Sequence, residues 1–343
     1  MKRILWLISL FVSLNSLAQD STMNSMLDTT IAVRQGVEIF SSEKAINANT
    51  TEMVGKGKMD FKVSHSFDDL AGSKGGIKDF FGLDNSTDVR IGFHLGITDR
   101  FNINVARAKG NGAIGRWRGP ELYEIALKFL LAQQLENDPK HPLAIALFAS
   151  NVISSANIKY NPPRDPITQA SLDTSLNQLY TYEDFGDRMS QVLQLIFARK
   201  MGKVSLLLSP TLVHTGHVAL HDQSTIFALG SAIRVPIGRS VNLLVDHFFT
   251  FRSKESKDYF NSVDNTFNPP SDIDKNSSAF KFYNPLGVGI EILTAGHVFR
   301  LNFTNATETM ENRFIPYTLS TWGKGEFRWA FTISRKFVVW RSE

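Results

Sequence analysis

Apolar and polar residues alternate along most of the chain, and a period of two residues predicts β-strands with one apolar and one polar face. In residues 324–338, one face carries aromatic and branched side chains, and the other carries mainly polar ones. The same alternation occurs at 87–97, 224–235 and 297–305. The chain is therefore expected to be mostly β-structure.

Reading this pattern from end to end predicts about twelve strands. Their expected ranges are 57–67, 87–97, 100–108, 121–133, 142–153, 189–200, 204–215, 224–235, 240–252, 284–293, 297–305 and 324–338. Several have the length of roughly 9–11 residues that a tilted strand needs to cross a bilayer. Two of them, 121–133 and 189–200, fit a helix equally well.

The connections between these strands are short and long in turn. The short ones, such as 98–99, 201–203 and 294–296, contain the turn residues Asp and Gly. The long ones include 154–188 and 253–283. This sorting is typical of an all-β, antiparallel, up-and-down transmembrane β-barrel with short periplasmic turns and long extracellular loops. An ordinary Phe-rich β-sandwich is the alternative, because the sequence holds 26 Phe.

The chain divides into three expected parts. Residues 1–18 have a basic start, an apolar run and small residues at Ser16 and Ala18, which is the pattern of a signal peptide cleaved after about Ala18. Residues 19–56 are mostly polar, with a short apolar piece at 36–40, and we interpret them as a periplasmic lead-in or a segment folded into the lumen. Residues 57–343 would form the outer-membrane β-barrel.

Composition excludes several classes of site and partner. The chain has no Cys, so disulfides, thiolate metal sites and thiol nucleophiles are absent. Its net charge is only +4, which predicts no nucleic-acid partner. The glycine-rich pieces lack the strand–loop–helix context of a phosphate site, and we expect no cofactor.

Alternation also predicts which charged side chains project into the lumen. These candidates are Arg90, His94, Glu124, Lys128, Arg234, Asp246, Glu291, Arg300, Glu326 and Arg328, and Gln194 shares their register. Charges survive in such a place only when they are paired or wet. They could form a paired network that plugs the lumen, or line a narrow aqueous path. A barrel of about twelve strands is compatible with both, because a barrel of eight strands encloses only side chains and one of 16–18 strands encloses a channel.

The histidines give two weaker hypotheses. His214, His217 and His221 would share a face on a helix and could bind a metal. In a strand that passes into a loop, His214 and His217 point to opposite faces, so the sequence favours histidines at the barrel rim. No histidine lies two residues before a serine, a spacing that would place both on one strand face as in a membrane-embedded hydrolase.

Three stretches resemble an uncharacterised family of outer-membrane β-barrel proteins of Gram-negative bacteria. They are residues 39–67, 80–107 and 284–306, and the first is the most specific, with Phe40, Ile46, Asn47 and Gly55. The resemblance implies a barrel in the outer membrane and implies no activity.

Three functions follow as hypotheses. The first is a narrow outer-membrane channel for small solutes or ions, without enzymatic activity, whose inward charges set selectivity. The second is a closed structural or accessory barrel of an envelope complex, and the third is an outer-membrane hydrolase. The expected partners are outer-membrane lipid and, for the second hypothesis, other envelope proteins.

Overall fold

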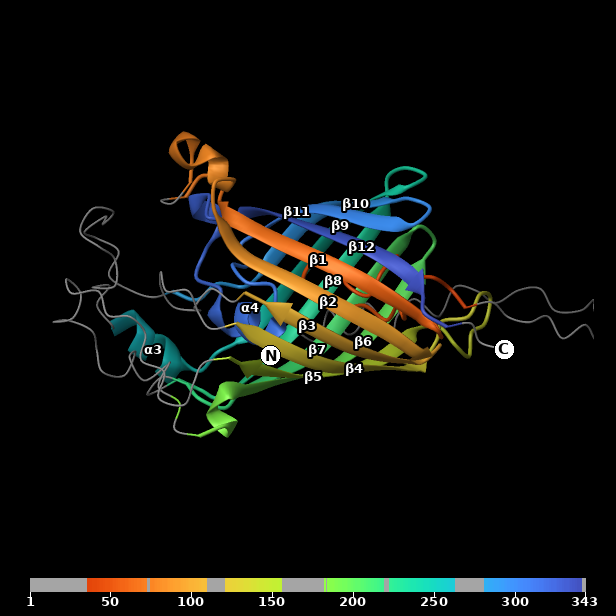
Figure 1. The fold of residues 1–343 in the computed structure, drawn as a ribbon, viewed down its shortest axis with the longest axis horizontal. Helices are drawn as coiled ribbons and strands as arrows, with labels where there is room; N and C mark the ends of the chain where they lie inside the picture. The colour runs from red at the N-terminus through yellow and green to blue at the C-terminus, as the bar shows by residue number, and fades with distance from the viewer. Residues whose placement is uncertain are drawn as a thin grey trace, which may run out of the picture. The chain divides into compact units, whose positions relative to one another are not determined.

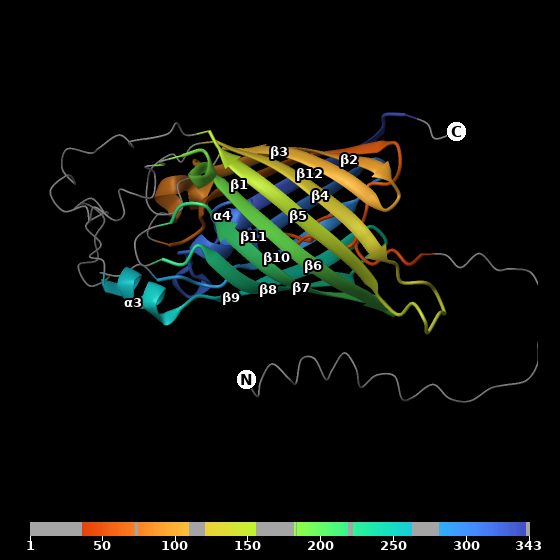
Figure 2. The same ribbon diagram turned by 90° about the horizontal axis from the view of Figure 1, so that it is seen from below.

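The computed structural model describes the barrel and the segment that precedes it. The described residues are 36–72, 75–109, 121–155, 182, 184–218, 222–262 and 281–340. Figures 1 and 2 show the strands of the barrel wall, which are tilted relative to the barrel axis.

Twelve strands make up the wall. They are β1 (Lys58–Asp69), β2 (Ser86–Thr98), β3 (Phe101–Ala108), β4 (Leu122–Ala132), β5 (Ala144–Ser154), β6 (Met189–Met201), β7 (Val204–Thr215), β8 (Thr225–Pro236), β9 (Val241–Phe251), β10 (Leu286–Leu293), β11 (His297–Thr304) and β12 (Arg328–Val338). Among the described residues, helices lie in the connections: η2 (Ile77–Gly82), η4 (Gly186–Arg188), α3 (Lys254–Ser262), α4 (Glu311–Tyr317) and η5 (Trp322–Lys324).

Each strand pairs with its neighbours in the sequence, and the first strand pairs with the last. Between β1 and β12, Lys58 lies opposite Val338 and Ser66 lies opposite Ala330, in antiparallel register. The order is therefore a closed barrel in which every strand has two antiparallel neighbours. Closure satisfies the backbone groups that an open sheet would expose. The predicted fold class and strand count are confirmed, and both segments that also fitted a helix are strands.

The two ends of the barrel differ in their connections. At one end, here called the turn end, the connections are 99–100, 133–143, 202–203, 237–240 and 294–296. At the other, the loop end, they are 70–85, 109–121, 155–188, 216–224, 252–285 and 305–327. The sorting by length is incomplete, because 133–143 is longer than 216–224.

The outer face of the wall is apolar. Ile125, Leu193 and Phe249 are 56%, 47% and 48% exposed, and each follows a buried residue on its strand. A continuous apolar surface around a closed barrel suits contact with lipid rather than water. No helix among the described residues is long and apolar enough to cross a membrane.

The last strand begins later than the sequence predicted. It starts at Arg328 rather than 324, because Gly325 has a left-handed backbone with φ of 74° at the end of η5. Glu326 therefore lies outside the strand, half-buried, where its carboxylate accepts a hydrogen bond from Thr321 N at 2.9 Å. The prediction that Glu326 projects into the lumen from a strand is wrong.

Candidate functional site

The other predicted lumen residues are buried on the inner face of the wall. The largest exposed fraction among them is 7%, at Arg234. These buried residues are Arg90, His94, Glu124, Lys128, Arg234, Asp246, Glu291, Arg300 and Arg328, together with Gln194. They occupy the buried positions of the alternating strand pattern, so an inward orientation follows from the register.

The interior of the barrel is occupied by residues 36–56, here called the lumen segment. Its groups make hydrogen bonds or ion pairs with inward side chains on nine strands. These partners are Lys62, His94, Asn102, Lys128, Gln194, Ser205, Arg234, Asp246, Arg300 and Thr304. Only a segment inside the barrel can reach strands on all sides of it. Of the two interpretations of residues 19–56, the structure places 36–56 in the lumen, and 19–35 lie outside the described residues.

The lumen segment makes a tight hairpin whose tip is held by Asp246. An antiparallel bridge pairs Lys44 with Asn49, and Ala45 N donates to Ala48 O. At the tip, one oxygen of the Asp246 carboxylate accepts hydrogen bonds from the backbone N–H groups of 46, 47 and 48, at 3.1, 2.5 and 2.8 Å. The other oxygen accepts from Asn47 Nδ2 at 3.1 Å. Hydrogen bonds to an ionised acceptor are the stronger kind, so Asp246 is the main anchor of this tip.

A second anchor surrounds the carboxylate of Glu43. Its Oε2 accepts from Lys62 Nζ at 2.9 Å and lies 2.7 Å from His94 Nδ1. Its Oε1 accepts from Asn102 Nδ2 at 2.7 Å, and Lys128 Nζ is 3.9 Å away. Glu43 is only 2% exposed. Three donors from β1, β2 and β3 therefore converge on a single carboxylate of the lumen segment, and the Lys128 ammonium of β4 adds a longer ion pair while it donates to Glu52 O.

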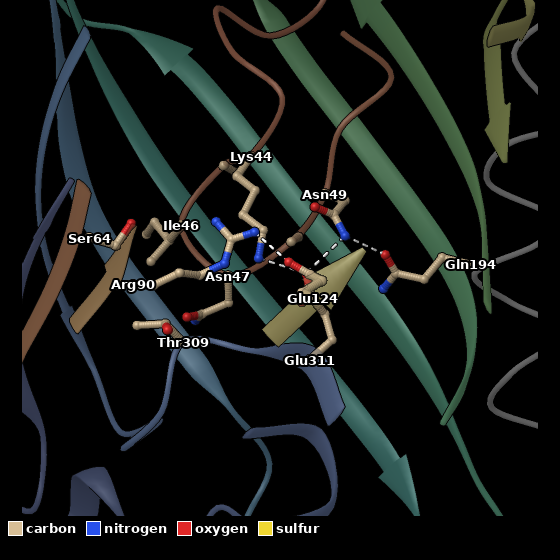
Figure 3. A network of polar contacts seen from close by, with 12 residues as sticks. Lys44, Ile46, Asn47, Asn49, Ser64, Arg90, Glu124, Gln194, Thr309 and Glu311 are labelled. Carbon is tan, nitrogen blue, oxygen red and sulfur yellow. Dashed lines mark hydrogen bonds and ion pairs between the residues drawn. The ribbon is translucent and has the colours of Figure 1, made fainter. Parts of the chain in front are cut away.

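Between these anchors, the segment also binds α4. Figure 3 shows Lys44 and Asn49 reaching Glu311, with Asn49 bonded to Gln194 as well. The Lys44 Nζ to Glu311 Oε1 distance is 2.6 Å. Because α4 belongs to the connection at the loop end, two parts of the chain meet inside the barrel: one leads into β1 at the turn end and the other comes from the loop end.

The contacts of the segment are also apolar on one side. Ile39 and Phe40 are each 1% exposed and belong to one buried cluster with Phe248 of β9 and Phe314 of α4. The wall there supplies many small residues, including Ala146 and Ala228. Burial of a large apolar side chain contributes about 1.5–3 kcal/mol, so Ile39 and Phe40 stabilise the occupied lumen together with the polar anchors.

Several predicted lumen residues pair within the wall instead. Arg90 donates to Glu124 across 2.5 Å, joining β2 to β4, and Arg328 donates to Asp69 at the same distance. Glu291 accepts from Asn242 Nδ2 at 3.1 Å. These pairs satisfy the requirement that a buried charge has a partner.

Two cavities adjoin the lumen segment. One, of about 260 Å³, lies toward the turn end and is lined by Thr51, Glu52, Met53, Arg100, Leu130 and Gln133, among others. The other, of about 30 Å³, is lined by Lys44, Asn47, Arg90, Asn302, Thr304 and Glu308, among others. Glu308 lies in the connection beyond β11, where burial raises its pKa to about 8.

The histidine trio does not form a metal site in the part of the chain that is described. His214 is exposed and bonds Thr225 Oγ1 at 2.9 Å, whereas His217 lies 3.9 Å from Asp187. His221 lies outside the described residues. No group of three acidic, histidine or cysteine ligands occurs among the described residues.

Sequence reasoning missed the partners that the lumen segment contributes. Glu43 was not a candidate, and neither were Lys62 and Asn102, which hold it. Lys62 is 2% exposed on β1, and the alternating register of β1 could have identified it. Glu43 has no such signal, because the lumen segment has no strand period.

Comparison with known proteins identifies one family. The family described as Membrane bound beta barrel domain (DUF5777) matches residues 40–337, a range that begins inside the lumen segment. This match confirms the resemblance to an uncharacterised family of membrane barrels. No curated protein matches the chain.

Solved structures resemble the chain only distantly. The KdgM porin is 7% identical, with 82% of this chain and 99% of the porin covered and a TM-score of 0.42. An outer membrane channel from Pseudomonas putida F1 is 13% identical, with coverages of 84% and 98% and a TM-score of 0.43. LpxR from Salmonella typhimurium is 9% identical, with coverages of 82% and 99% and a TM-score of 0.32. These likenesses are too distant to carry an argument about function.

Proposed function

We propose that this chain, which belongs to the membrane bound beta barrel domain family, is an outer-membrane channel for small polar solutes. In the conformation described above, the lumen segment closes the channel. Residues 1–18 would direct export and be removed. The channel opens when residues 36–56 leave their seat in the wall. We propose a channel rather than an enzyme, because the buried His94 is engaged by Glu43 as part of that seat.

The observation that carries this proposal is the polar character of the wall behind the segment. Lys62, His94, Asn102, Asp246 and Arg300 all point into the lumen and bind the segment by hydrogen bonds or ion pairs. Water and polar solutes can replace such partners at modest cost, whereas an apolar wall would exclude them. A wall of this kind is suited to a lumen that is wet in one of its states.

The buried apolar cluster supports a second candidate, the closed accessory barrel. Ile39 and Phe40 pack against Phe248 and Phe314, and leaving this cluster would expose apolar surface. If that cost keeps the segment in place permanently, the barrel conducts nothing, and its loops or its N-terminal part serve as a binding platform for envelope proteins.

A reversible disulfide between the lumen segment and the wall distinguishes the channel from the accessory barrel. A Cβ built on Gly287 lies 2.9 Å from Ile46 Cγ2, one bond from the Ile46 Cβ, so cysteines at these positions bring a side chain of the segment against β10. The same Cβ lies 2.7 Å from Asp246 Oδ1, so this carboxylate has to shift in every variant that carries Gly287→Cys. Disulfides need Cβ atoms about 3.5–4.5 Å apart, which this placement allows. The chain contains no other cysteine. The variant Ile46→Cys with Gly287→Cys is therefore expected to close the channel when oxidised and to release it when reduced.

The measurement is single-channel current in a planar bilayer, before and after a reductant is added. The channel proposal expects openings from the wild type and from the reduced pair, and silence from the oxidised pair. Each single-cysteine variant serves as a control and should conduct to the same extent with and without reductant. Gly287→Cys alone also measures how the shift of the Asp246 carboxylate changes the current, and the pair is compared with it. Silence from folded wild type and from the reduced pair would overturn the channel and favour the accessory barrel. Equal current from the oxidised and reduced pair would show that the segment is not the gate.

A further inference from the structure

We propose that Lys62, His94 and Asn102 form a receptor for a carboxylate, that Glu43 occupies it in the closed barrel, and that a free carboxylate of a small acidic solute takes the same place when the lumen segment moves. The receptor rests on the contacts of Glu43 alone. Its role in transport rests on the proposed channel function.

The geometry is that of an anion site with both oxygens bound. Lys62 Nζ and His94 Nδ1 meet one oxygen of Glu43, at 2.9 and 2.7 Å, and Asn102 Nδ2 meets the other at 2.7 Å. All three donors are at most 3% exposed, and they come from three adjacent strands of the wall. A rigid wall holds them in place, so they do not depend on the segment for their arrangement.

The charges around this place require an anion. Lys62 and Lys128 are buried cations near Glu43, and Asp60 is a buried anion 3.2 Å from Lys62. Glu43 lies within 3.9 Å of both ammonium groups, whereas Asp60 neighbours Lys62 and Glu52 interacts with Lys128. Without Glu43 both ammonium groups lose a nearby carboxylate, and a buried charge that loses its partner is strongly unfavourable. Withdrawal of the segment is therefore easier when another anion fills the position.

Carboxylate is the chemistry that the donors favour. The ammonium, the imidazole N–H and the amide N–H supply donors to two oxygens, which matches a planar carboxylate, and the place accommodates the carboxylate of one side chain. Glu43 thus acts as an internal stand-in for part of the solute. The solute class that follows is small organic acids, or larger molecules that present a carboxylate, rather than neutral solutes or cations.

The test removes the stand-in and supplies a free carboxylate. Glu43→Ala, made in the full chain, is refolded into detergent with sodium acetate, sodium chloride or acetamide at equal concentrations. The readout is the fraction that migrates as folded barrel on an unheated gel. Acetate is expected to raise the ratio of folded to unfolded protein in proportion to one plus its concentration divided by its dissociation constant, which is about elevenfold at ten times that constant. Chloride and acetamide should have much smaller effects.

Two matched variants show where the acetate acts. Glu43→Gln fills the same space with an amide, so acetate should not change its folding. Lys62→Met in the Glu43→Ala background removes the cation and should abolish the gain. The receptor is overturned if chloride helps as much as acetate, if acetate stabilises Glu43→Gln equally, or if Glu43→Ala fails to refold in acetate while Glu43→Gln refolds normally.

This outcome is independent of conduction. A receptor without single-channel current would retain the carboxylate site and discard the channel, whereas current without rescue by acetate would retain the channel and discard the receptor.

Discussion

At the scale of single residues, one carboxylate joins the wall to the tip of the lumen segment. Asp246 accepts hydrogen bonds from three consecutive backbone N–H groups and from Asn47 Nδ2. Buried N–H groups without an acceptor are costly, so the tip depends on an acceptor at this position and is held most tightly when the acceptor is charged.

Asp246→Asn is expected to weaken the binding of the segment tip to the wall without releasing the tip completely. An amide oxygen can still accept, but the loss of charge weakens the bonds, by about 2 kcal/mol in sum. That change corresponds to roughly a thirtyfold shift toward the released state. Hydrogen exchange at the amides of residues 46–48 measures it directly, and exchange there should be faster by about that factor.

A matched control for this variant is Glu291→Gln. Glu291 is also a buried inward carboxylate, but its partners are Asn242 and, at 3.9 Å, Arg234, both of the wall. Its substitution should leave exchange at 46–48 unchanged. Unchanged exchange in Asp246→Asn, or the same acceleration in Glu291→Gln, would show that Asp246 is not the specific anchor.

Glu308 gives the barrel a pH dependence at its loop end. Burial raises its pKa to about 8, with Asp88 adding to the rise and Arg313 opposing it. In the unfolded chain, the ordinary pKa of a glutamate is about 4.3. The folded state therefore holds a proton that the unfolded state releases. The stabilisation is complete below the unfolded pKa and is lost as the pH rises through about 8.

Glu308→Gln should flatten this dependence. Between roughly pH 4.5 and 8, the wild type should lose up to about 1.4 kcal/mol of unfolding free energy per pH unit from this group. The variant should lose none of it and should be the more stable protein at pH 8. Urea unfolding across this pH range provides the measurement, and Glu326→Gln, at the same end, is the control that should keep the wild-type slope. Parallel slopes for wild type and Glu308→Gln would contradict the assignment.

At the scale of elements, the strands could be predicted and the lumen segment could not. In a strand such as β2, polar and apolar residues alternate because the two faces have different surroundings: Arg90 and His94 face inward, and Ile91 and Phe93 face outward. Pairing with neighbours in sequence then follows from short connections. Even β4 and β6, which also fit a helix, are decided by the ladders on both sides of them.

The sequence of the lumen segment has no such alternation. Its residues take their positions from partners far along the chain, as when Asn47 bonds Asp246 and Thr304. Nothing in the spacing of residues 36–56 indicates which wall residues they meet, so the seat of Glu43 could not be read from the sequence. The late start of β12 is a smaller case, since Gly325 sets it through its backbone conformation.

At the scale of the whole molecule, the barrel has an apolar outside and a polar, charged inside. This is the inverse of a soluble protein, and lipid is the surrounding that makes it stable. Apolar residues such as Leu127 are exposed along the middle of the wall. The loss of stability caused by a charged residue there depends on its depth in the bilayer, and it is largest at the midplane and small at the interfaces.

Two arginine substitutions on the outer surface test this placement. Leu127 is 40% exposed near the centre of β4, and Ile237 is 61% exposed in the connection at the turn end. In lipid vesicles, Leu127→Arg should lower the unfolding free energy by about 2–4 kcal/mol, and Ile237→Arg by about 0–1 kcal/mol. Urea unfolding of vesicle-embedded protein measures both. Equal losses would mean that β4 does not cross the hydrocarbon core, because depth is the only property of the surroundings that should separate two exposed apolar positions.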